Sequence, residues 1–392
     1  MRFAKLVPAI GVVGIVAMAC GGGGGTATTS PAVVPASLSV SSFDVTFSAM
    51  ATLKDLHAAG SGLVGVLMPD TTSSTRWVNS DLPYLTKAFQ MAGYSSSEFK
   101  IDNAQGNDAT ELALAQADIT QGAKVLVMAP LDSTVGTQIQ TLAQSKGVKL
   151  ISYDRATFTG TNTYYVSFDN VQVGNLIGMG FKACLTAWNV SSPKVFTLNG
   201  GEDTDPNAID FAKGYNNAVW GDSVPQETVG KTANGATLVG DQVAPGWDNS
   251  KGQTIFQQQY TAHPEINATI EANDGLANAV VTVLKQKGVP ANKIPTTGQD
   301  ASLGGIENVL TGYQCGTVYK PIYLEAQDAV ALATILRAGL TPPTALVNKT
   351  TQSAAPKPGD NTQPASLLTP YWVDKTKVAS TVIADNFVDK AT

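Results

Sequence analysis

The chain has 392 residues, of which 43% are hydrophobic and 14% charged, and its formal net charge is −6. This length and apolar content are enough for two or three domains of roughly 100–200 residues each. The chain is acidic and has no cluster of lysine and arginine, so it lacks the basic surface that nucleic-acid binding requires, and we expect no nucleic-acid partner.

The N-terminal residues have the pattern of an export signal. A short basic start, "MRFAK", precedes an apolar segment from Leu6 to Ala19, which is shorter than the roughly 20 residues of a membrane-spanning helix. The small residues of "AMAC" are typical of a signal-peptide cleavage site, so we predict a signal peptide over residues 1–19.

Cys20 directly follows this segment, and "AMAC" resembles the lipobox of bacterial lipoproteins, although Ala17 stands where that motif usually has leucine. The resemblance implies that Cys20 is lipidated and anchors the protein to a membrane. An ordinary signal peptide with an incidental cysteine is the alternative. The residues after Cys20 are rich in Gly, Ser, Thr and Pro, and we predict a flexible tether over residues 20–61.

Two further cysteines, Cys184 and Cys315, remain in the exported chain. Paired thiols in an exported protein can form a disulfide. Two buried free thiols are the alternative, and the spacing alone does not decide between them.

From Gly62 onward, short apolar runs alternate with segments of helical period. The runs, which we interpret as strands, cover residues 62–69, 124–130, 148–154, 194–201, 268–274 and 294–300. The helices expected between them cover residues 82–93, 108–122, 134–147, 171–188, 208–220, 250–263 and 275–288. Continuously apolar strands that alternate with amphipathic helices indicate parallel sheets covered on both faces. The fold class is therefore α/β, and the two series, over 62–165 and about 193–300, predict two doubly wound domains. The proline-rich region 342–370 is expected to contribute little to a core.

Polar side chains follow nearly every predicted strand. In open α/β sheets, ligands bind beyond the carboxyl ends of the strands, so these residues are candidates for a binding site. Each one taken singly is more simply explained as a turn or helix-cap residue, but their recurrence in both halves favours a site. They are Arg76, Trp77, Asp154, Arg155, Asp205, Asn207, Asn273, Asp274, Gln299 and Asp300.

Carboxylates beside arginine and amide groups suit the recognition of sugar hydroxyls, which both donate and accept hydrogen bonds. The indole rings of Trp77 and Trp247 can cover the apolar C–H face of a sugar ring. Asp154 and Arg155 lie side by side at the end of "LISYDR", and we interpret them as an acceptor and a donor presented together to neighbouring hydroxyls. A surface ion pair there would contribute only about 0–1 kcal/mol.

A glycoside hydrolase is the main alternative, because paired carboxylates also cleave glycosides. Donors around the carboxylates should keep them ionised rather than poised as acids. The only histidines, His57 and His263, are not placed like a general base, and neither a zinc-binding cluster nor a nucleotide-binding loop is present in the sequence. We therefore expect no enzymatic activity, no metal and no cofactor.

Several segments together resemble the periplasmic sugar-binding proteins of ABC importers, and most closely their xylose-binding branch. The most specific ones are "YDR", "SFDN", "GQD" and "VYKP", and the similarity runs from about Gly62 to Phe387. It implies a type I periplasmic binding protein fold with two lobes and three hinge crossings. The expected first lobe comprises about 62–165 and 302–342, and the second about 166–301 and 343–392.

The resemblance also implies a set of ligand contacts. The family's contacts match Arg76, Trp77, Asp154, Arg155, Asp205, Asn207, Trp247, Asn273 and Asp300, and they add Lys320, which pattern alone would assign to a solvated strand. Val243 occupies a place where close family members can carry a second aromatic residue.

The implied function is the capture of a monosaccharide by hinge closure and its delivery to an ABC permease. Xylose is the favoured ligand, with glucose, arabinose and galactose as competitors, and we expect an exported, membrane-anchored monomer in the periplasm or on the outer face of the membrane. A sugar sensor that presents its closed form to a membrane receptor is the alternative, because the same fold serves both uses.

Overall fold

The computed structural model describes residues 32–157, 163–201, 205–350 and 363–389. The predicted signal peptide, Cys20 and the first part of the tether lie outside these residues. No helix within the described ranges is long and apolar enough to cross a membrane.

The first lobe is built on a seven-stranded sheet with the order β11-β12-β5-β4-β3-β1-β2, parallel except for β11. Its strands are β1 (Leu63–Met68), β2 (Phe99–Asn103), β3 (Ala123–Met128), β4 (Lys149–Tyr153), β5 (Thr163–Phe168), β11 (Lys349–Thr350) and β12 (Pro364–Leu368). Successive side chains point to opposite faces, so Val64 and Val66 of β1 enter one core and Leu67 enters another.

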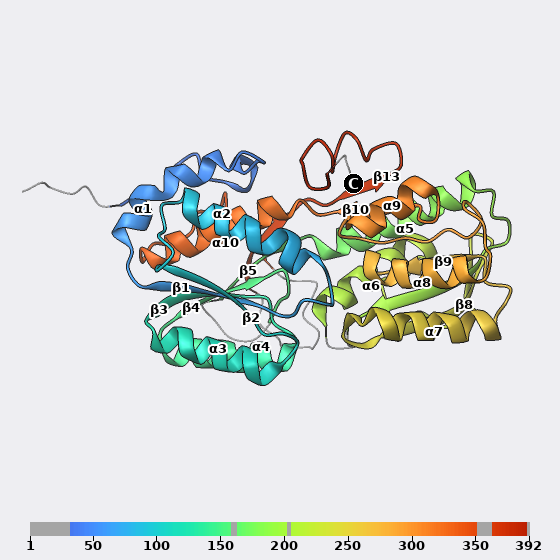
Figure 1. The fold of residues 1–392 in the computed structure, drawn as a ribbon, viewed down its shortest axis with the longest axis horizontal. Coiled ribbons are helices and arrows are strands. Elements are labelled where there is room, and N and C mark those ends of the chain that lie inside the picture. Colours follow the sequence, from blue (N-terminus) through green and yellow to red (C-terminus); the bar gives the residue numbers. More distant parts are fainter. Residues whose placement is uncertain (1–31, 158–162, 202–204, 351–362, 390–392) are drawn as a thin grey trace, which may run out of the picture. The chain divides into compact units, whose positions relative to one another are not determined.

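Helices cover both faces of this sheet. On one face lie α1 (Lys54–Ala59), α2 (Leu82–Met91) and α10 (Ile322–Arg337), and on the other lie α3 (Asp108–Thr120) and α4 (Ser133–Ser145) (Figure 1). Figure 1 shows α2 and α10 above the sheet and α3 and α4 below it.

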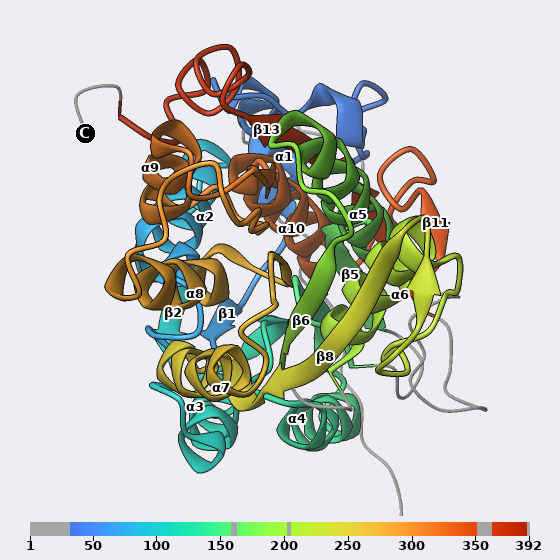
Figure 2. The same cartoon turned by 90° about the vertical axis from the view of Figure 1, so that its right-hand side faces the viewer.

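The second lobe has a smaller sheet with the order β7-β8-β6-β9. Its strands are β6 (Lys194–Gly200), β7 (Thr232–Ala233), β8 (Ala236–Ala244) and β9 (Ala268–Glu271). The helices are α5 (Asn170–Ala187), α6 (Pro206–Trp220), α7 (Asn249–Ala262), α8 (Asp274–Gln286) and α9 (Leu303–Thr311). Figure 2 shows α5 and α6 on one side of β6 and β8, with α7 and α8 on the other. The helices predicted from the sequence are thus confirmed in both lobes.

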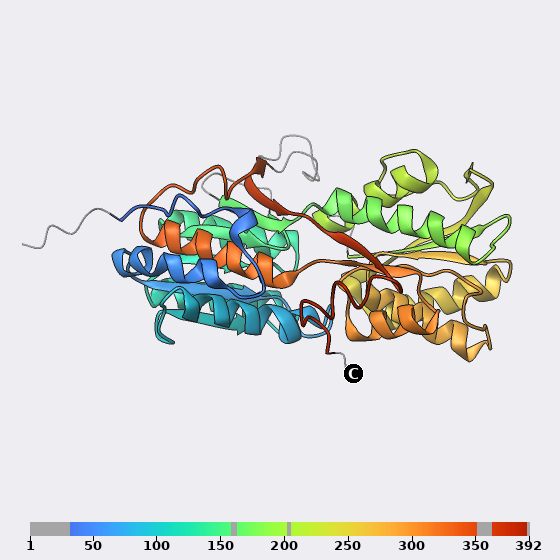
Figure 3. The ribbon, with the colours of Figure 1, turned by 90° about the horizontal axis from the view of Figure 1, so that it is seen from above.

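Three chain segments connect the lobes. The first leads from β5 into α5, the second from β10 (Gly316–Tyr319) into α10, and the third from β12 into β13 (Tyr371–Asp374). The second and third run alongside one another (Figure 3), because β10 and β13 pair as antiparallel strands. Two doubly wound lobes joined by three segments are the fold expected from the sequence.

Two segments belong to a different lobe from the one expected from the sequence. Residues 302–319 lie with the second lobe, because α9 packs beside α8 and Val318 enters the second core. Residues 364–368 lie with the first lobe, because β12 pairs in parallel with β5 and buries Ala365. The region around β12 is thus more buried than its proline-rich composition indicated. The expected strand over 294–300 is reduced to a single bridge between Gln299 and Val318.

The predicted tether is also shorter than residues 20–61. Residues 32–61 contain η1 (Val40–Ser42), η2 (Ser48–Leu53) and α1, and they pack onto the first lobe. Phe47, Met50, Leu53 and Leu56 are each 1% exposed or less. Burial of such large apolar side chains stabilises the packed segment by roughly 1.5–3 kcal/mol per side chain, which composition alone did not indicate.

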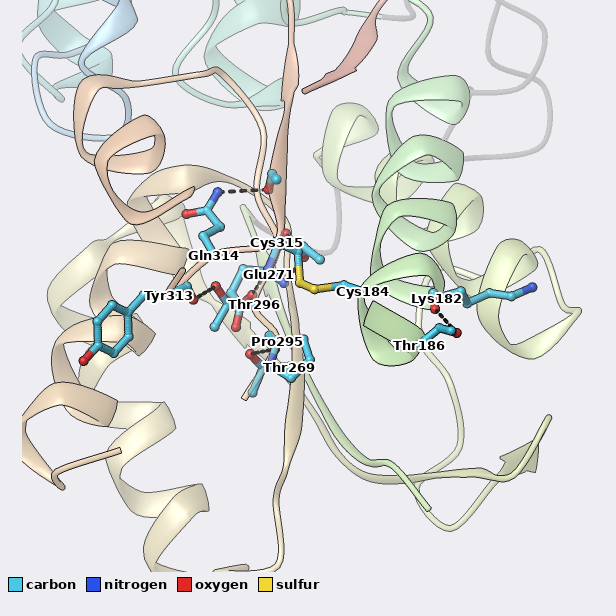
Figure 4. The surroundings of a disulfide bond; sticks show 12 residues. Lys182, Cys184, Thr186, Thr269, Glu271, Pro295, Thr296, Tyr313, Gln314 and Cys315 are labelled. Carbon is cyan, nitrogen blue, oxygen red and sulfur yellow. Dashed lines mark hydrogen bonds between the residues drawn. A yellow bond between two sulfur atoms is a disulfide. The ribbon is translucent and has the colours of Figure 1, made fainter. Parts of the chain in front are cut away.

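Cys184 of α5 and Cys315, directly before β10, form a disulfide with a Cα–Cα distance of 5.9 Å. Figure 4 shows the bond between the helix and the segment that holds Gln314, beside Thr296 of a neighbouring segment. The disulfide therefore links α5 to β10, the strand that leads into the second of the three segments connecting the lobes.

Candidate ligand-binding site

One cavity between the two lobes brings together every ligand-contact residue predicted above. It has about 350 Å³ of unoccupied space, part of it open to solvent. Its lining comprises Arg76, Trp77, Asp154, Arg155, Asp205, Asn207, Trp247, Asn273, Asp300 and Lys320, together with Ser73, Ser74, Phe211 and Gln299.

The loop after β1 folds back on itself and positions Trp77. Asp70 accepts hydrogen bonds from the main-chain N–H groups of Thr72 (2.7 Å) and Ser73 (2.6 Å), and Ser73 Oγ accepts one from Trp77 Nε1 (3.2 Å). The indole is only 2% exposed. The guanidinium groups of Arg76 and Arg155 lie 4.7 and 5.3 Å from its ring centroid, within the range of cation–π attraction.

Arg76 is held by three carboxylates from different elements. Its Nε and Nη2 donate to both oxygens of Asp81 (2.9 and 2.8 Å), Nη2 also donates to Glu325 of α10 (2.7 Å), and Nη1 donates to Asp154 (2.5 Å). Tyr153 donates its hydroxyl to the same Asp81 (2.6 Å). Such a bidentate, buried arginine is fixed in orientation, so it places Asp154 at the cavity wall.

The charges of this network are strongly coupled. Burial alone would lower the pKa of Arg76, but the Asp154, Asp81 and Glu325 carboxylates raise it well above its ordinary value. Burial raises the pKa of Asp154, yet Arg76, Lys320 and Arg155 outweigh this effect and lower it, so Asp154 is ionised. Burial raises the pKa of Glu325 well above its ordinary value, and Arg76 offsets this only in part. This raised pKa favours the protonated form of Glu325.

Asp154 and Arg155 are adjacent in sequence but bind different partners. Arg155 donates to the main-chain oxygen of Pro130 (3.3 Å) and to Ser73 Oγ (3.1 Å). Asp154 pairs with Arg76 and lies 3.7 Å from Lys320 Nζ. The two side chains do not form the surface ion pair that was one explanation of "YDR" in the sequence, and both line the cavity.

On the second lobe, Asp205 begins α6 and anchors Trp247. Its Oδ1 accepts from the N–H groups of Asn207 (2.9 Å) and Ala208 (3.2 Å), and its Oδ2 accepts from Trp247 Nε1 (2.8 Å). The indole packs so closely on β6 that a Cβ at Gly200 would lie 2.0 Å from it. Asp205 thus acts as a helix cap, as its residue type suggested, and also orients an aromatic wall of the cavity.

The remaining second-lobe residues follow β9 or the bridge at Gln299. Asn273 caps α8 by accepting from Leu276 N–H (2.9 Å). Asp300 forms a buried ion pair with Lys320 (3.0 Å). Asp274 does not line this cavity and instead accepts from Ser302 N–H (2.8 Å), where burial, reinforced by the Asp300 charge, raises its pKa to about 7.

Direct contacts join the two lobes at this cavity. Asn207 donates its side-chain amide to the main-chain oxygen of Asp154 (3.0 Å), and Ser74 donates to Asp300 (3.3 Å). Lys320 lies between β10 and α10, at one of the crossings, and faces carboxylates of both lobes. The site therefore depends on the relative position of the lobes.

The backbone is strained at the same place. Asp154 (φ 58°), Trp247 (φ 59°), Asp300 (φ 95°) and Ala301 (φ 49°) all adopt positive φ values. Non-glycine residues in such conformations cost of order 1–3 kcal/mol each and cluster at binding and active sites.

Some lining and supporting residues were absent from the predicted set. Ser73 and Ser74 lie in the polar loop that the sequence pointed to, so a signal existed for them, whereas Gln299 was already among the strand-end candidates. Asp81 and Glu325 carried no signal, because they lie in or next to helices and act through Arg76. Within the described residues, no group of three or more His, Cys, Asp or Glu side chains is placed to hold a metal ion.

A family model described as a periplasmic binding protein domain matches residues 64–340. The chain belongs to this family. It is 32% identical over 290 residues to the D-xylose-binding periplasmic protein of Escherichia coli, covering 73% of this chain and 80% of the relative. It is also 32% identical over 373 residues to a multiple sugar-binding periplasmic protein of Azospirillum brasilense, covering 90% and 99%.

Solved structures show the same fold. A carbohydrate transporter solute-binding protein from Chloroflexus aurantiacus in complex with D-glucose aligns with a TM-score of 0.69 at 24% identity, covering 84% of this chain and 98% of that chain. A myo-inositol-binding protein from Caulobacter aligns with a TM-score of 0.63 at 19% identity, covering 83% and 98%. These periplasmic binding proteins are solute-binding proteins and not enzymes.

Proposed function

We propose that this protein is an exported solute-binding protein that captures a monosaccharide, D-xylose or a similar aldose, between its lobes and delivers it to an ABC importer. The observation that carries the proposal is the cavity between the lobes, which combines carboxyl acceptors, fixed donors and two indole rings. The names of the relatives, which are xylose-binding and multiple sugar-binding periplasmic proteins, support the same ligand class.

The geometry supports a mechanism of hinge closure. A ligand shifts the equilibrium between open and closed forms only by its difference in affinity for the two. Asp154 and Arg155 come from the first lobe and Asn207 and Asp300 from the second, so a sugar that bonds to all of them binds only the closed form tightly. Gln299 Oε1 is buried and accepts no hydrogen bond from the described residues, so a hydroxyl in the cavity can supply its missing donor.

Export and anchoring complete the proposal. Membership of the periplasmic binding protein family is consistent with the predicted signal peptide, and lipidation at Cys20 would hold the protein at the membrane near its permease. A xylose preference is favoured over other aldoses by the similarity to D-xylose-binding periplasmic proteins of two bacteria.

A thermal-shift screen over D-xylose, D-glucose, L-arabinose and D-galactose, followed by calorimetric titration, tests the proposal. We expect D-xylose or a similar aldose to raise the melting temperature and to bind with micromolar or tighter affinity. Asp154→Asn and Asp300→Asn should each abolish this binding while Asp55→Asn, an exposed control, keeps it. Asparagine tolerates positive φ, so these variants remove charge without adding strain. Binding of none of these sugars would refute the proposed function.

A further inference from the structure

A second, larger cavity adjoins the ligand cavity. It has about 800 Å³ of unoccupied space, part of it continuous with solvent, compared with about 350 Å³ in the ligand cavity. Ser73, Arg155, Asp205 and Trp247 line both cavities. These shared walls make the two spaces neighbours.

The second cavity also draws on both lobes. The first lobe contributes the segment from Pro130 to Ser133 and the loop around Thr72, and the second contributes Pro206 and Gly246. A ligand that fills this space therefore touches both lobes and adds to the difference in affinity between closed and open forms. Contact with both lobes therefore favours the closed form here, as it does in the ligand cavity.

The room in this cavity comes from residues that lack large side chains. Gly106 (φ 73°), Gly201 (φ 73°) and Gly246 (φ 65°) all line it, and a Cβ built at Gly246 would meet no atom within 4 Å. Positive φ favours glycine at each position. The lining is thus partly main chain.

The chemistry of the lining favours a neutral polyol over an anion. The carboxylates of Asp70, Asp132 and Asp205 line the cavity, and Arg155 is the single cation among its described lining residues. Each of these carboxylates already caps a turn or a helix, so each is fixed in place as an acceptor. Trp247, Pro130 and Pro206 offer apolar surface to C–H groups. Acceptors beside apolar surface suit a sugar ring, while three acidic groups repel a phosphate or a carboxylate.

We propose that this second cavity is a subsite for a second sugar ring, so that the protein binds disaccharides with one ring in the ligand cavity and the other beside Trp247. The inference rests on the proposed sugar-binding function and extends its substrate class from monosaccharides to short glycosides. Trp247 is shared by both subsites because its indole lies on the boundary between them.

Two substitutions at positions that line the second cavity but not the ligand cavity test the proposal. Thr72 is exposed and Ser133 is partly exposed at the start of α4, and neither lines the ligand cavity. Thr72→Trp and Ser133→Trp should each place an indole in the second cavity. Thr141→Trp, at an exposed position on the same helix as Ser133, is the matched control.

Calorimetric titration of each variant with D-xylose, D-glucose, xylobiose, cellobiose and maltose gives the readout. We expect the wild type and Thr141→Trp to bind at least one disaccharide within about tenfold of its monosaccharide. Thr72→Trp and Ser133→Trp should weaken the affinity for that disaccharide tenfold or more. They should change the affinity for the monosaccharide by less than about threefold.

Three results would overturn the subsite while leaving monosaccharide binding intact. The wild type could bind the monosaccharide but no disaccharide, the two blocking variants could leave disaccharide affinity unchanged, or they could weaken both ligands equally. Failure to bind any monosaccharide would instead refute the proposed function on which the subsite rests.

Discussion

Lys320 and Asp300 form a buried ion pair in which Nζ lies 3.0 Å from Oδ1, and the two side chains are 4% and 10% exposed. The same ammonium lies 3.7 Å from Asp154 of the first lobe. Lys320 stands between β10 and α10, where the chain crosses from one lobe to the other. One cation at the hinge therefore faces acceptors of both lobes.

We predict that Lys320→Met weakens sugar binding by on the order of 100-fold, since truncating one partner of a buried charge pair at a binding site costs about 2–5 kcal/mol of binding free energy. The substitution leaves Asp300 without its cation and Asp154 with one cation fewer. Isothermal titration with the preferred sugar measures the effect.

Lys251→Met is the matched control, because Lys251 is 58% exposed and its nearest carboxylate is 3.9 Å away. Its affinity should equal that of the wild type. Equal affinities for the Lys320 and Lys251 variants would contradict the role of Lys320 at the hinge.

The two acids that support Arg76 should respond differently to neutralisation. Asp81 accepts hydrogen bonds on both oxygens from Arg76, whereas Glu325 has a raised pKa and one oxygen with no hydrogen-bond partner among the described residues. Glu325→Gln should therefore keep sugar affinity within about threefold. Asp81→Asn should weaken binding at least tenfold and lower the free energy of unfolding by about 3–5 kcal/mol, because its amide group opposes the arginine donors.

Titration calorimetry and urea unfolding of the two variants check this contrast. Equal losses in Glu325→Gln and Asp81→Asn would show that Glu325 carries its charge in the folded protein and that the assigned protonation is wrong.

The Cys184–Cys315 disulfide should stabilise the second lobe without affecting the site. It closes a loop of 131 residues, and loss of a native disulfide costs about 2–5 kcal/mol. The double variant Cys184→Ala/Cys315→Ala should lose that much stability in denaturant unfolding. Sugar affinity below the unfolding transition should be unchanged, since neither cysteine lines the ligand cavity. A tenfold loss of affinity in the folded double variant would show that the disulfide shapes the site.

Glu271 should make stability depend on pH. Its carboxyl is buried in the second lobe, and burial raises its pKa from 4.5 to about 8 despite hydrogen bonds from Thr269 and Thr297. Between these values the folded protein retains a proton that the unfolded chain has released. The stability from the neutral carboxyl is therefore fully present below pH 4.5 and is lost as the pH rises through about 8.

Between pH 4.5 and about 8, ionisation of Glu271 lowers the free energy of unfolding by up to about 1.4 kcal/mol per pH unit. Glu271→Gln, which mimics the neutral carboxyl, should abolish this contribution. Melting temperatures from pH 5 to pH 9 measure it, with the exposed Glu307→Gln as control. Parallel curves for wild type and Glu271→Gln would contradict the buried neutral state.

The regular parts of the fold were predictable because their signals are local. Apolar strands such as 62–69 and helices such as 82–93 carry their period in the sequence, and β1 and α2 lie where they were expected. The lobe boundaries were not predictable, because the position of β12 beside β5 depends on a long-range pairing with no local pattern. The packing of residues 32–61 was missed for the same reason, since Phe47 and Met50 meet distant helices.

Much of the site was predictable from the rule that ligands bind where parallel strands end. Asp154, Asn207 and Asp300 follow strands or begin helices, and all line the cavity. Lys320 needed the family resemblance, because nothing in "VYKP" marks a lysine that becomes 4% exposed. Glu325 lies inside a helix and reaches the site only through Arg76, so no sequence pattern pointed to it.

A crystal structure of the protein grown with the aldose preferred in the thermal-shift screen tests the central claim most directly. We predict one sugar ring in the cavity between the lobes, with hydroxyls hydrogen-bonded to Asp154 and Arg155 on one side and to Asn207 and Asp300 on the other. A sugar bound outside this cavity, or bound by side chains of one lobe alone, would contradict the account.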